Sequence, residues 1–317
     1  MTPLDRIKYS GNIDELIHKI SDIHNVGHVN NFSIIETGYE DCNVVIETNE
    51  GKYLTKIFSK NRSKEDVLRY SMIMEKAVDA GVNHPALIKT REGAWVGQAV
   101  EDVFEVLMNY VDGKTFYQSG SMPNKEELNV VLEQAAKINR IDHHPKYLFD
   151  SWAISNIQSM YERIRQYIKP DDAQLIVKAI DNYLKIPVAD LPHCFVHGDF
   201  TKANVLKGND SKIYILDFSV SNWYPRMQEL AVIAANLLHD EKHTSSLRER
   251  CDLVYTNYNL LNPLTKLEHD NLFTYSVAGL AMELLGSYQE RFINGNDNEE
   301  TRFWYNLGRE GLREALN

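Results

Sequence analysis

The stretch HGDFTKAN at residues 197–204, followed by ILDF at residues 215–218, is the most informative part of this sequence. The surrounding residues His193–Leu206 and Lys212–Phe218 predict two short apolar strands that bracket a polar loop. An HGD or a DF pattern alone is common and predicts little. Two strands joined as a hairpin, however, would bring the polar side chains at both loop ends to one spot. The ordered combination therefore indicates a functional site.

The polar residues of this stretch match the parts that phosphoryl transfer requires. A carboxylate must orient and deprotonate the acceptor, oxygen ligands must hold Mg²⁺ on the phosphates of ATP, and a cation must contact the phosphate tail. Asp199 is the candidate base, and Asn204 and Asp217 are the candidate metal ligands. His197 is expected to pack and to orient the loop. Its spacing from His193 does not indicate zinc, because the residues between them continue a strand.

At these residues the sequence resembles aminoglycoside phosphotransferases, choline kinases and type II homoserine kinases, which are relatives of the protein kinases. The specific part of the resemblance covers about residues 190–232, and the order of elements follows the family over most of the chain. The resemblance implies that Asp199 is the catalytic base, that Asn204 and Asp217 bind Mg²⁺, and that ATP is the donor. Where the family often has an Asp-Leu-Ala that braces the catalytic loop, this chain has Glu229-Leu230-Ala231, so Glu229 is expected to be structural.

The resemblance implies an α+β, protein-kinase-like fold with two lobes, and the hydrophobic periodicity agrees with this division. Residues 1–108 are expected to form a β-rich N-terminal lobe that also carries helices, and residues 109–113 a hinge. Residues 114–317 are expected to form a helical C-terminal lobe, with the active site between the lobes. The expected strands of the first lobe are Phe32–Ile35, Asn43–Thr48, Lys52–Phe58, Ala94–Val100 and Val103–Val111, and its expected helices are Asn12–Ile23 and Ser63–Ala80.

The N-terminal lobe also supplies the expected nucleotide contacts. Lys56 lies in YLTKIF (residues 53–58), which resembles the family strand whose lysine contacts the ATP phosphates. Gly38 is the single glycine of residues 35–43, where the phosphate-covering loop should be. The backbone groups of Asn109 and Val111 are expected to bind adenine. Glu75, on the predicted helix 63–80, is the expected partner of Lys56.

Four features of the sequence have competing interpretations. Glu65 competes with Glu75 as the partner of Lys56. Glu40 and Asp41 lie in the expected phosphate-covering loop and would repel phosphate if they faced inward. Glu283 lies beside the apolar stripe of a predicted helix, so it is either solvated or directed at a cationic acceptor. Trp223-Tyr224 is equally compatible with the core and with the wall of an acceptor pocket.

Charge and cysteine content exclude several function classes. The 317 residues contain 34 basic and 45 acidic side chains, and a net charge of -11 disfavours binding to nucleic acid or to an anionic membrane. The three cysteines are far apart and show no metal or disulfide spacing, which suits a reducing compartment. No signal-peptide pattern and no apolar run of about 18 residues occurs. We therefore expect a cytoplasmic protein whose partner is a small-molecule acceptor.

The predicted function is transfer of the γ-phosphoryl group of ATP, with Mg²⁺, to a hydroxyl of a small polar metabolite or drug. One alternative is a non-catalytic nucleotide-binding or regulatory protein on the same scaffold, and the complete set of Lys56, Asp199, Asn204 and Asp217 argues against it. The other is a protein kinase. Asp217-Phe218 is followed by serine, and no Ala-Pro-Glu occurs downstream, so a recognisable activation segment is missing.

Overall fold

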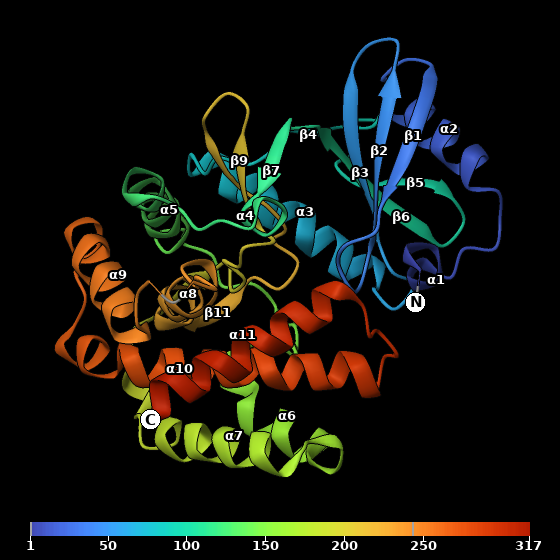
Figure 1. Ribbon diagram of the computed structural model, residues 1–317. Helices are drawn as coiled ribbons and strands as arrows, with labels where there is room; N and C mark the ends of the chain where they lie inside the picture. Colours follow the sequence, from blue (N-terminus) through green and yellow to red (C-terminus); the bar gives the residue numbers. More distant parts are fainter. Residues whose placement is uncertain (1, 243) are drawn as a thin grey trace. The chain divides into compact units, whose positions relative to one another are not determined.

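The computed structural model describes residues 2–242 and 244–317, which fold into two compact units (Figure 1). Unit 1 contains the described residues up to Val78 together with His84–Asp112, and unit 2 contains Asp79–Asn83 and the described part of Gly113–Asn317. The chain passes from one unit to the other between Asp112 and Gly113, inside the residues expected to form the hinge. The short segment Asp79–Asn83 joins unit 2 because the Asn83 backbone N–H donates to Gln134 of that unit (2.7 Å).

Unit 1 is built on one antiparallel sheet. Its strand order is β1-β2-β3-β6-β4. The strand β5 pairs with the first residues of β6, which β4 does not reach. The predicted hairpin is confirmed, because Val45 of β2 lies opposite Leu54 of β3. The strands are β1 Val29–Ile35, β2 Cys42–Thr48, β3 Lys52–Ile57, β4 Leu87–Ile88, β5 Gly97–Val100 and β6 Val103–Asn109.

Three helices accompany this sheet: α1 Pro3–Ile7, α2 Ile13–His24 and α3 Lys64–Asp79. The side chain of Asn12 caps α2, as predicted, by accepting a hydrogen bond from the Asp14 N–H (2.9 Å). Leu16, Ile17 and Ile20 of α2 are fully buried in one cluster with apolar residues of β2. Burial of these apolar faces against each other holds the helix to the sheet.

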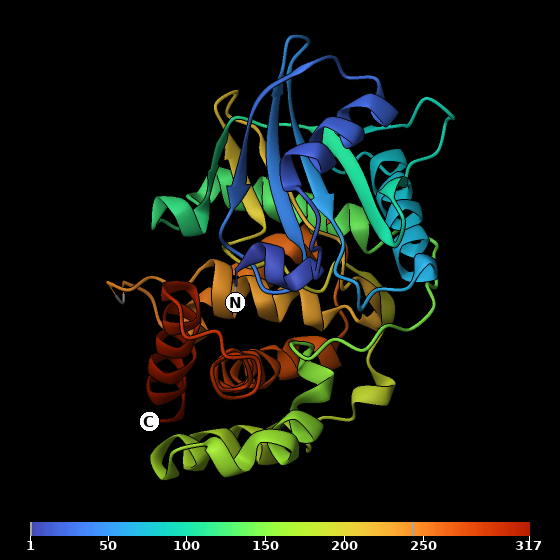
Figure 2. The ribbon, with the colours of Figure 1, turned by 90° about the vertical axis from the view of Figure 1, so that its right-hand side faces the viewer.

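Unit 2 is mainly helical, and α10 runs through its centre. Figure 2 shows α10 nearly end-on, with α11 beside it and α7 beneath it. A Cβ atom on Gly308 of α11 would lie 2.7 Å from the carbonyl oxygen of Leu280 in α10, so this glycine lets the two backbones approach closely. The helices are α4 Phe116–Ser119, α5 Lys125–Ile138, α6 Ile157–Ile164, α7 Pro170–Tyr183, α8 Met227–Val232, α9 Leu247–Leu261, α10 Lys266–Phe292 and α11 Glu299–Leu316, with a π-helical turn η4 at Ile233–Leu237 and 3₁₀ turns η1 Ile154–Asn156, η2 Arg165–Tyr167 and η3 Val188–Asp190.

Two small antiparallel sheets interrupt the helices of unit 2. One contains β7 Gly113–Thr115, β9 Val205–Gly208 and β10 Ile213–Ile215, and the other contains β8 His193–Val196 and β11 Asn222–Pro225. The prediction of one strand over 193–206 was wrong, because its two ends belong to different sheets. The chain leaves β8 after Val196 because Gly198 adopts a left-handed backbone (φ 89°) that a strand does not contain. Among the described helices, none is both long and apolar enough to cross a membrane.

Candidate functional site

The loop at residues 197–204 carries the first two predicted site residues and holds them in contact. The side-chain amide of Asn204 donates to the Asp199 carboxylate (Nδ2 to Oδ2, 2.6 Å) and to the Asp199 carbonyl oxygen (3.2 Å). The backbone carbonyl oxygen of Asn204 in turn accepts from the N–H of Leu216 (2.8 Å), and Leu216 directly precedes Asp217. The β9–β10 hairpin therefore places the ends of the two motifs side by side, as the sequence predicted.

Asp217 occupies a strained backbone position just after β10. Its φ of 61° lies in the left-handed region, which costs a residue other than glycine about 1–3 kcal/mol. Both the backbone N–H (3.1 Å) and the hydroxyl of Ser219 donate to Asp217 Oδ1. These bonds orient the carboxylate, and strain of this kind is concentrated at functional sites.

His197 connects the two motifs through both of its ring nitrogens. Nε2 donates to the Leu216 carbonyl oxygen (2.9 Å), and Nδ1 accepts from the Asp199 N–H (3.2 Å). Burial lowers the pKa of His197 to about 4, so the ring is neutral at neutral pH and these two bonds define its tautomer. Its edge-on contacts with the rings of Phe200 and Phe218 complete the packing. This is the orienting role that the sequence suggested.

Glu229, at the start of α8, supports the loop where it leaves β8. Its two carboxylate oxygens accept from the N–H groups of His197 and Gly198, each at 2.9 Å. These donors have no strand partner beyond Val196, so the carboxylate satisfies them. The expected structural role of Glu229 is confirmed. Burial raises the pKa of Glu229 to about 7, although both backbone hydrogen bonds act in the opposite direction.

A second support of the loop was not predicted. Asn236 lies in the π-helical turn η4, and its side-chain oxygen accepts from the Lys202 N–H (2.9 Å). Its side-chain nitrogen donates to the carboxylate of Glu283 on α10. Glu283 is only 9% exposed, so the solvated alternative for this residue is wrong. A π-helical turn is rare and frequently lies at a functional site, but its five-residue register leaves no periodic signal in the sequence.

The electrostatic setting of Asp199 is acidic. Burial and the neighbouring charge of Asp217 raise the pKa of Asp199 to about 7, and Glu300 of α11 acts in the same direction. Burial raises the pKa of Glu283 to about 8, and the charge of Asp199 adds to this effect. Carboxylates with raised pKa values in one place are typical of catalytic sites and of sites that receive a cation.

The residues present fit a phosphate-bound magnesium ion. Mg²⁺ usually takes one or two carboxylates from the protein and fills its other positions with phosphate oxygens and water. Asp217 supplies a carboxylate, and Asn204 has an amide oxygen beside the amide nitrogen that contacts Asp199. Among the described residues, no group of three or more His, Cys, Asp and Glu side chains could hold a metal ion by itself. This donor set suits an ion that arrives with a nucleotide.

Aromatic side chains adjoin the same loop. The Tyr117 N–H at the start of α4 donates to the Lys202 carbonyl oxygen (2.9 Å). The Tyr117 ring contacts the rings of Phe303 (5.1 Å) and Trp304 (5.4 Å) on α11. Burial and the nearby Glu300 raise the pKa of Tyr117 to about 12. The sequence analysis missed these residues, because nothing in the sequence connects α4 with α11.

Trp223 and Tyr224 were each expected to lie either in the core or in the wall of an acceptor pocket. The structure decides between these alternatives for Tyr224. Both lie on β11, which pairs with β8. Tyr224 is buried in a small cluster with Ala153 and Val196, and therefore belongs to the core. Trp223 is half-buried and meets the ring of His144 edge-on at 4.8 Å.

In unit 1, Lys56 of β3 is buried and makes an ion pair with Asp41 (Nζ to Oδ2, 3.2 Å). The predicted partner Glu75 has an exposed side chain on α3, so the structure does not support that assignment. The physical reason is strand register: Asn43 lies opposite Lys56, so the residues at the start of β2 are its immediate neighbours. Both acids of the expected phosphate-covering loop make ion pairs, since Arg62 binds the carboxylates of Glu40 and Asp41.

Gly38 lies in a loop that a buried arginine of α1 holds in place. Arg6 donates to the carbonyl oxygens of Glu36 (3.1 Å), Thr37 (3.5 Å) and Asp41 (3.4 Å). Gly38 has a φ of 97°, which side chains rarely adopt, and this is the reason for a glycine here. The sequence analysis missed Arg6, because a single arginine in a short helix carries no specific signal.

Of the two residues expected to bind adenine, Asn109 is the last residue of β6 and Val111 comes two residues later. The Asn109 N–H donates to the Ala86 carbonyl oxygen (2.9 Å), so this group is already occupied within unit 1. The expectation that the backbone of Asn109 binds adenine was therefore wrong for its N–H group. The Asn109 carbonyl and the backbone of Val111 remain predictions.

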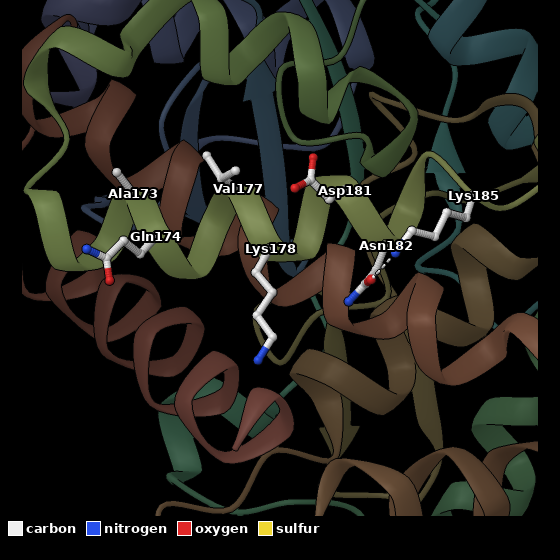
Figure 3. Close-up of a pocket in the computed structure, with 7 residues that line it drawn as sticks. All are labelled: Ala173, Gln174, Val177, Lys178, Asp181, Asn182 and Lys185. Atoms are coloured by element: carbon white, nitrogen blue, oxygen red, sulfur yellow. Dashed lines mark hydrogen bonds between the residues drawn. The ribbon is translucent and has the colours of Figure 1, made fainter.

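A separate hollow of about 540 Å³ lies along α7 (Figure 3). Its lining includes Gln174, Lys178 and Asp181, and none of its lining residues is a predicted site residue. Lys178 donates to the carbonyl oxygen of Leu316 near the end of the described chain (2.7 Å). We assign no role to this hollow.

Comparison with known proteins supports the family suggested by the sequence. Over 269 residues, the chain is 22% identical to a homoserine kinase of Granulibacter bethesdensis, covering 82% of this chain and 81% of that protein. The amicoumacin kinase hAmiN, solved with AMP-PNP, Ca²⁺ and Ami, has a TM-score of 0.70 at 11% identity, covering 97% of this chain and 95% of that one. The choline kinase LicA from Streptococcus pneumoniae has a TM-score of 0.67 at 14% identity, covering 96% and 99%.

These structural likenesses confirm the protein-kinase-like α+β fold, with a β-rich unit and a helical unit. The sequence also matches a family described as the phosphotransferase enzyme family over residues 31–255, which is more than two thirds of the 317 residues. The protein therefore belongs to the phosphotransferase enzyme family and is a small-molecule phosphotransferase.

Proposed function

We propose that the protein transfers the γ-phosphoryl group of ATP, bound together with Mg²⁺, to a hydroxyl group of a small polar acceptor. The observation that carries this proposal is the contact of Asn204 with Asp199 in the loop next to Asp217. It supplies a base and two metal ligands in one part of unit 2, and these are the parts that phosphoryl transfer needs.

Asp199 is proposed to accept the proton of the acceptor hydroxyl. As that proton leaves, the acceptor oxygen forms a bond to the γ-phosphorus, and the bond from this phosphorus to the departing ADP oxygen breaks. The amide of Asn204 holds one carboxylate oxygen of Asp199, so the other can face the acceptor. His197 and Glu229 keep the loop in this geometry through its backbone. Such positioning is the main contribution of the protein to phosphoryl transfer.

Asn204 and Asp217 are proposed to hold the Mg²⁺ ion. When bound, this ion neutralises negative charge on the phosphates and orients them for transfer. In unit 1, Lys56 and the loop containing Gly38 are proposed to bind the phosphate tail, and the carbonyl of Asn109 and the backbone of Val111 the adenine. The amicoumacin kinase solved with AMP-PNP and Ca²⁺ supports a nucleotide and a divalent ion as cofactors in this family.

The acceptor is proposed to carry an amino or ammonium group besides its hydroxyl. The charge of Glu300 raises the pKa of Asp199, and the charge of Asp199 raises the pKa of Glu283. A cation next to Asp199 would therefore lie among carboxyl groups. Aromatic rings on α4 and α11 adjoin the same loop and can attract a cation. Homoserine and choline, which give two of the similar proteins their names, both combine a hydroxyl with a positive nitrogen.

The decisive experiment measures ADP release with MgATP and a panel of acceptors. The panel should contain homoserine, choline and an aminoglycoside, together with a neutral sugar and a generic protein substrate. We expect turnover with an amine-bearing alcohol, and loss of that turnover in Asp199→Asn. Binding of ATP without turnover of any acceptor would favour the non-catalytic alternative, and phosphorylation of the protein substrate would favour a protein kinase.

The cytoplasm is the proposed location, with no nucleic acid or membrane partner. All three cysteines are unpaired, and Cys42 and Cys251 are buried. Free thiols in a folded protein suit a reducing compartment. Fractionation of cells that express the full chain tests this proposal, and recovery with the membrane fraction would contradict it.

A further inference from the structure

The carboxylate of Asp41 binds three groups at one end of strands β2 and β3 in unit 1. Asp41 Oδ1 accepts from the Ser59 N–H (2.9 Å) and from Arg62 Nε (3.2 Å), and Oδ2 contacts Lys56 Nζ (3.2 Å). The side chains of Asp41 and Lys56 are only 3% and 5% exposed. A buried carboxylate with partners on both oxygens has little freedom to move, and it restricts its partners equally.

Strand register is the cause of this contact. Cys42 lies opposite Ile57, and Asn43 lies opposite Lys56, so the start of β2 and the end of β3 are neighbours in the sheet. Asp41 comes just before β2, and Ser59 comes two residues after β3. The Asp41 carboxylate therefore links the start of β2 to the end of β3, where Lys56 and Ser59 lie. This arrangement depends on the sheet and not on the position of α3.

Asp41 also belongs to the loop that contains Gly38. The Asp41 carbonyl oxygen accepts from Arg6 Nη1 (3.4 Å), and the same guanidinium binds the carbonyls of Glu36 and Thr37. One residue thus contacts the loop support through its backbone and Lys56 through its side chain. The loop and the lysine are held as one assembly by groups of unit 1.

We propose that Asp41 is the positioning residue for Lys56, in place of the exposed Glu75. It holds the lysine ammonium in the orientation that binds the phosphate tail, while remaining outside the reacting atoms. This inference rests on the proposed function, because it assigns Lys56 to the nucleotide phosphates. It also explains an acid in the expected phosphate-covering loop, since the carboxylate of Asp41 contacts Lys56 and would not face the phosphates.

The test compares Asp41→Asn with Glu75→Gln, which removes the same charge from α3, and with Lys56→Ala. AMP-PNP affinity in the presence of Mg²⁺, kcat and both KM values are measured for each. We expect Asp41→Asn to reduce kcat/KM for ATP by about tenfold or more, without a change in the acceptor KM. Glu75→Gln should stay within about twofold of the wild type, and Asp41→Glu should recover part of the loss.

A double-mutant cycle separates positioning from a general loss of structure. In a Lys56→Met background, Asp41→Asn should weaken AMP-PNP binding no further, because the group that it orients is gone. This double variant also removes both charges together, so it is the form to use if Asp41→Asn alone is too unstable. A further loss in that background as large as in the wild type would overturn the inference, as would wild-type kinetics for Asp41→Asn.

Failure of the inference is distinguishable from failure of the proposed function. If the wild type neither binds AMP-PNP with Mg²⁺ nor turns over, the proposed function is wrong. A different result would leave the function intact. If the wild type is active, and both Lys56→Ala and Glu75→Gln lower kcat/KM for ATP while Asp41→Asn does not, only the positioning role of Asp41 is wrong.

Discussion

The buried carboxylate beside Lys56 in unit 1 and those around the loop at residues 197–204 in unit 2 have different partners. In unit 1, Asp41 lies against the cationic groups of Lys56 and Arg62. In unit 2, Glu229 is held by backbone N–H groups, and Glu283 by the amide of Asn236. The charge of Asp41 is therefore compensated by cations of the protein itself, whereas Glu229 and Glu283 are hydrogen-bonded by neutral donors.

The pKa values show the consequence of this difference. Burial raises the pKa of Asp199 to about 7, of Glu229 to about 7 and of Glu283 to about 8. Neutral donors offset only part of the cost of burying a carboxylate. The surroundings of Asp199 would therefore be stabilised by a cation that arrives with the substrates, whereas in unit 1 the Lys56 ammonium is already paired with Asp41. The predictions below test this division of charge, beginning with the largest expected effect.

Asp217→Ala should abolish Mg²⁺-dependent ATP binding, because the phosphate-bound ion loses its carboxylate ligand. Asn204→Ala should have a smaller effect, since a neutral ligand contributes less charge. Titration of Mg²⁺ against ATP affinity in each variant measures the order of the two effects. Equal effects, or none, would place the metal outside this loop.

Asp199→Asn should lower turnover by about 10²-fold or more, which is the usual contribution of a positioned base, and leave nucleotide binding nearly intact. Asparagine retains an oxygen that can accept from the Asn204 amide, so the loop geometry should be preserved. Single-turnover kinetics with a saturating acceptor measure the effect. A variant as fast as the wild type would remove Asp199 from the role of base.

Lys56→Ala should weaken ATP binding or turnover and keep the protein folded. Asp41 retains the Ser59 N–H and Arg62 as partners in this variant, so its carboxylate is not left without donors. Thermal unfolding and the KM for ATP are measured together. Unchanged kinetics would mean that Lys56 does not act on the nucleotide.

Glu283→Gln should become progressively more stable than the wild type as the pH rises. The folded pKa of about 8 exceeds the ordinary value of 4.5, so the folded state binds more protons than the unfolded state between these values. The stability of the wild type therefore falls as pH rises through this window, and glutamine removes this contribution while still accepting from Asn236. Melting temperatures at pH 5, 7 and 9 provide the test, and a pH-independent difference would contradict it.

Much of the candidate site in unit 2 could be predicted from the sequence because its residues are close along the chain. Asp199 and Asn204 share one loop, and Asp217 follows the next hairpin strand, so local pairing brings them together. The brace Glu229 is more distant, but the motif that surrounds it resembles the family. Local spacing and motif order carry this information without knowledge of the packing.

The partner of Lys56 and the second support of the loop depended on tertiary structure. A helix carboxylate such as Glu75 fits the family pattern, but strand register places Asp41 beside the lysine instead. Asn236 reaches Lys202 through a π-helical turn, and its register is not apparent in the sequence. These contacts join residues that periodicity treats as independent.

The hairpin of unit 1 and the spacing of the polar residues in the loop at 197–204 follow from local pattern. The sheet to which β8 and β9 each belong, and the burial of Glu283, follow from long-range packing. The physical reason is that turn residues and hydrophobic periodicity act over a few residues. The pairing and desolvation of a charge, by contrast, depend on every element that surrounds it.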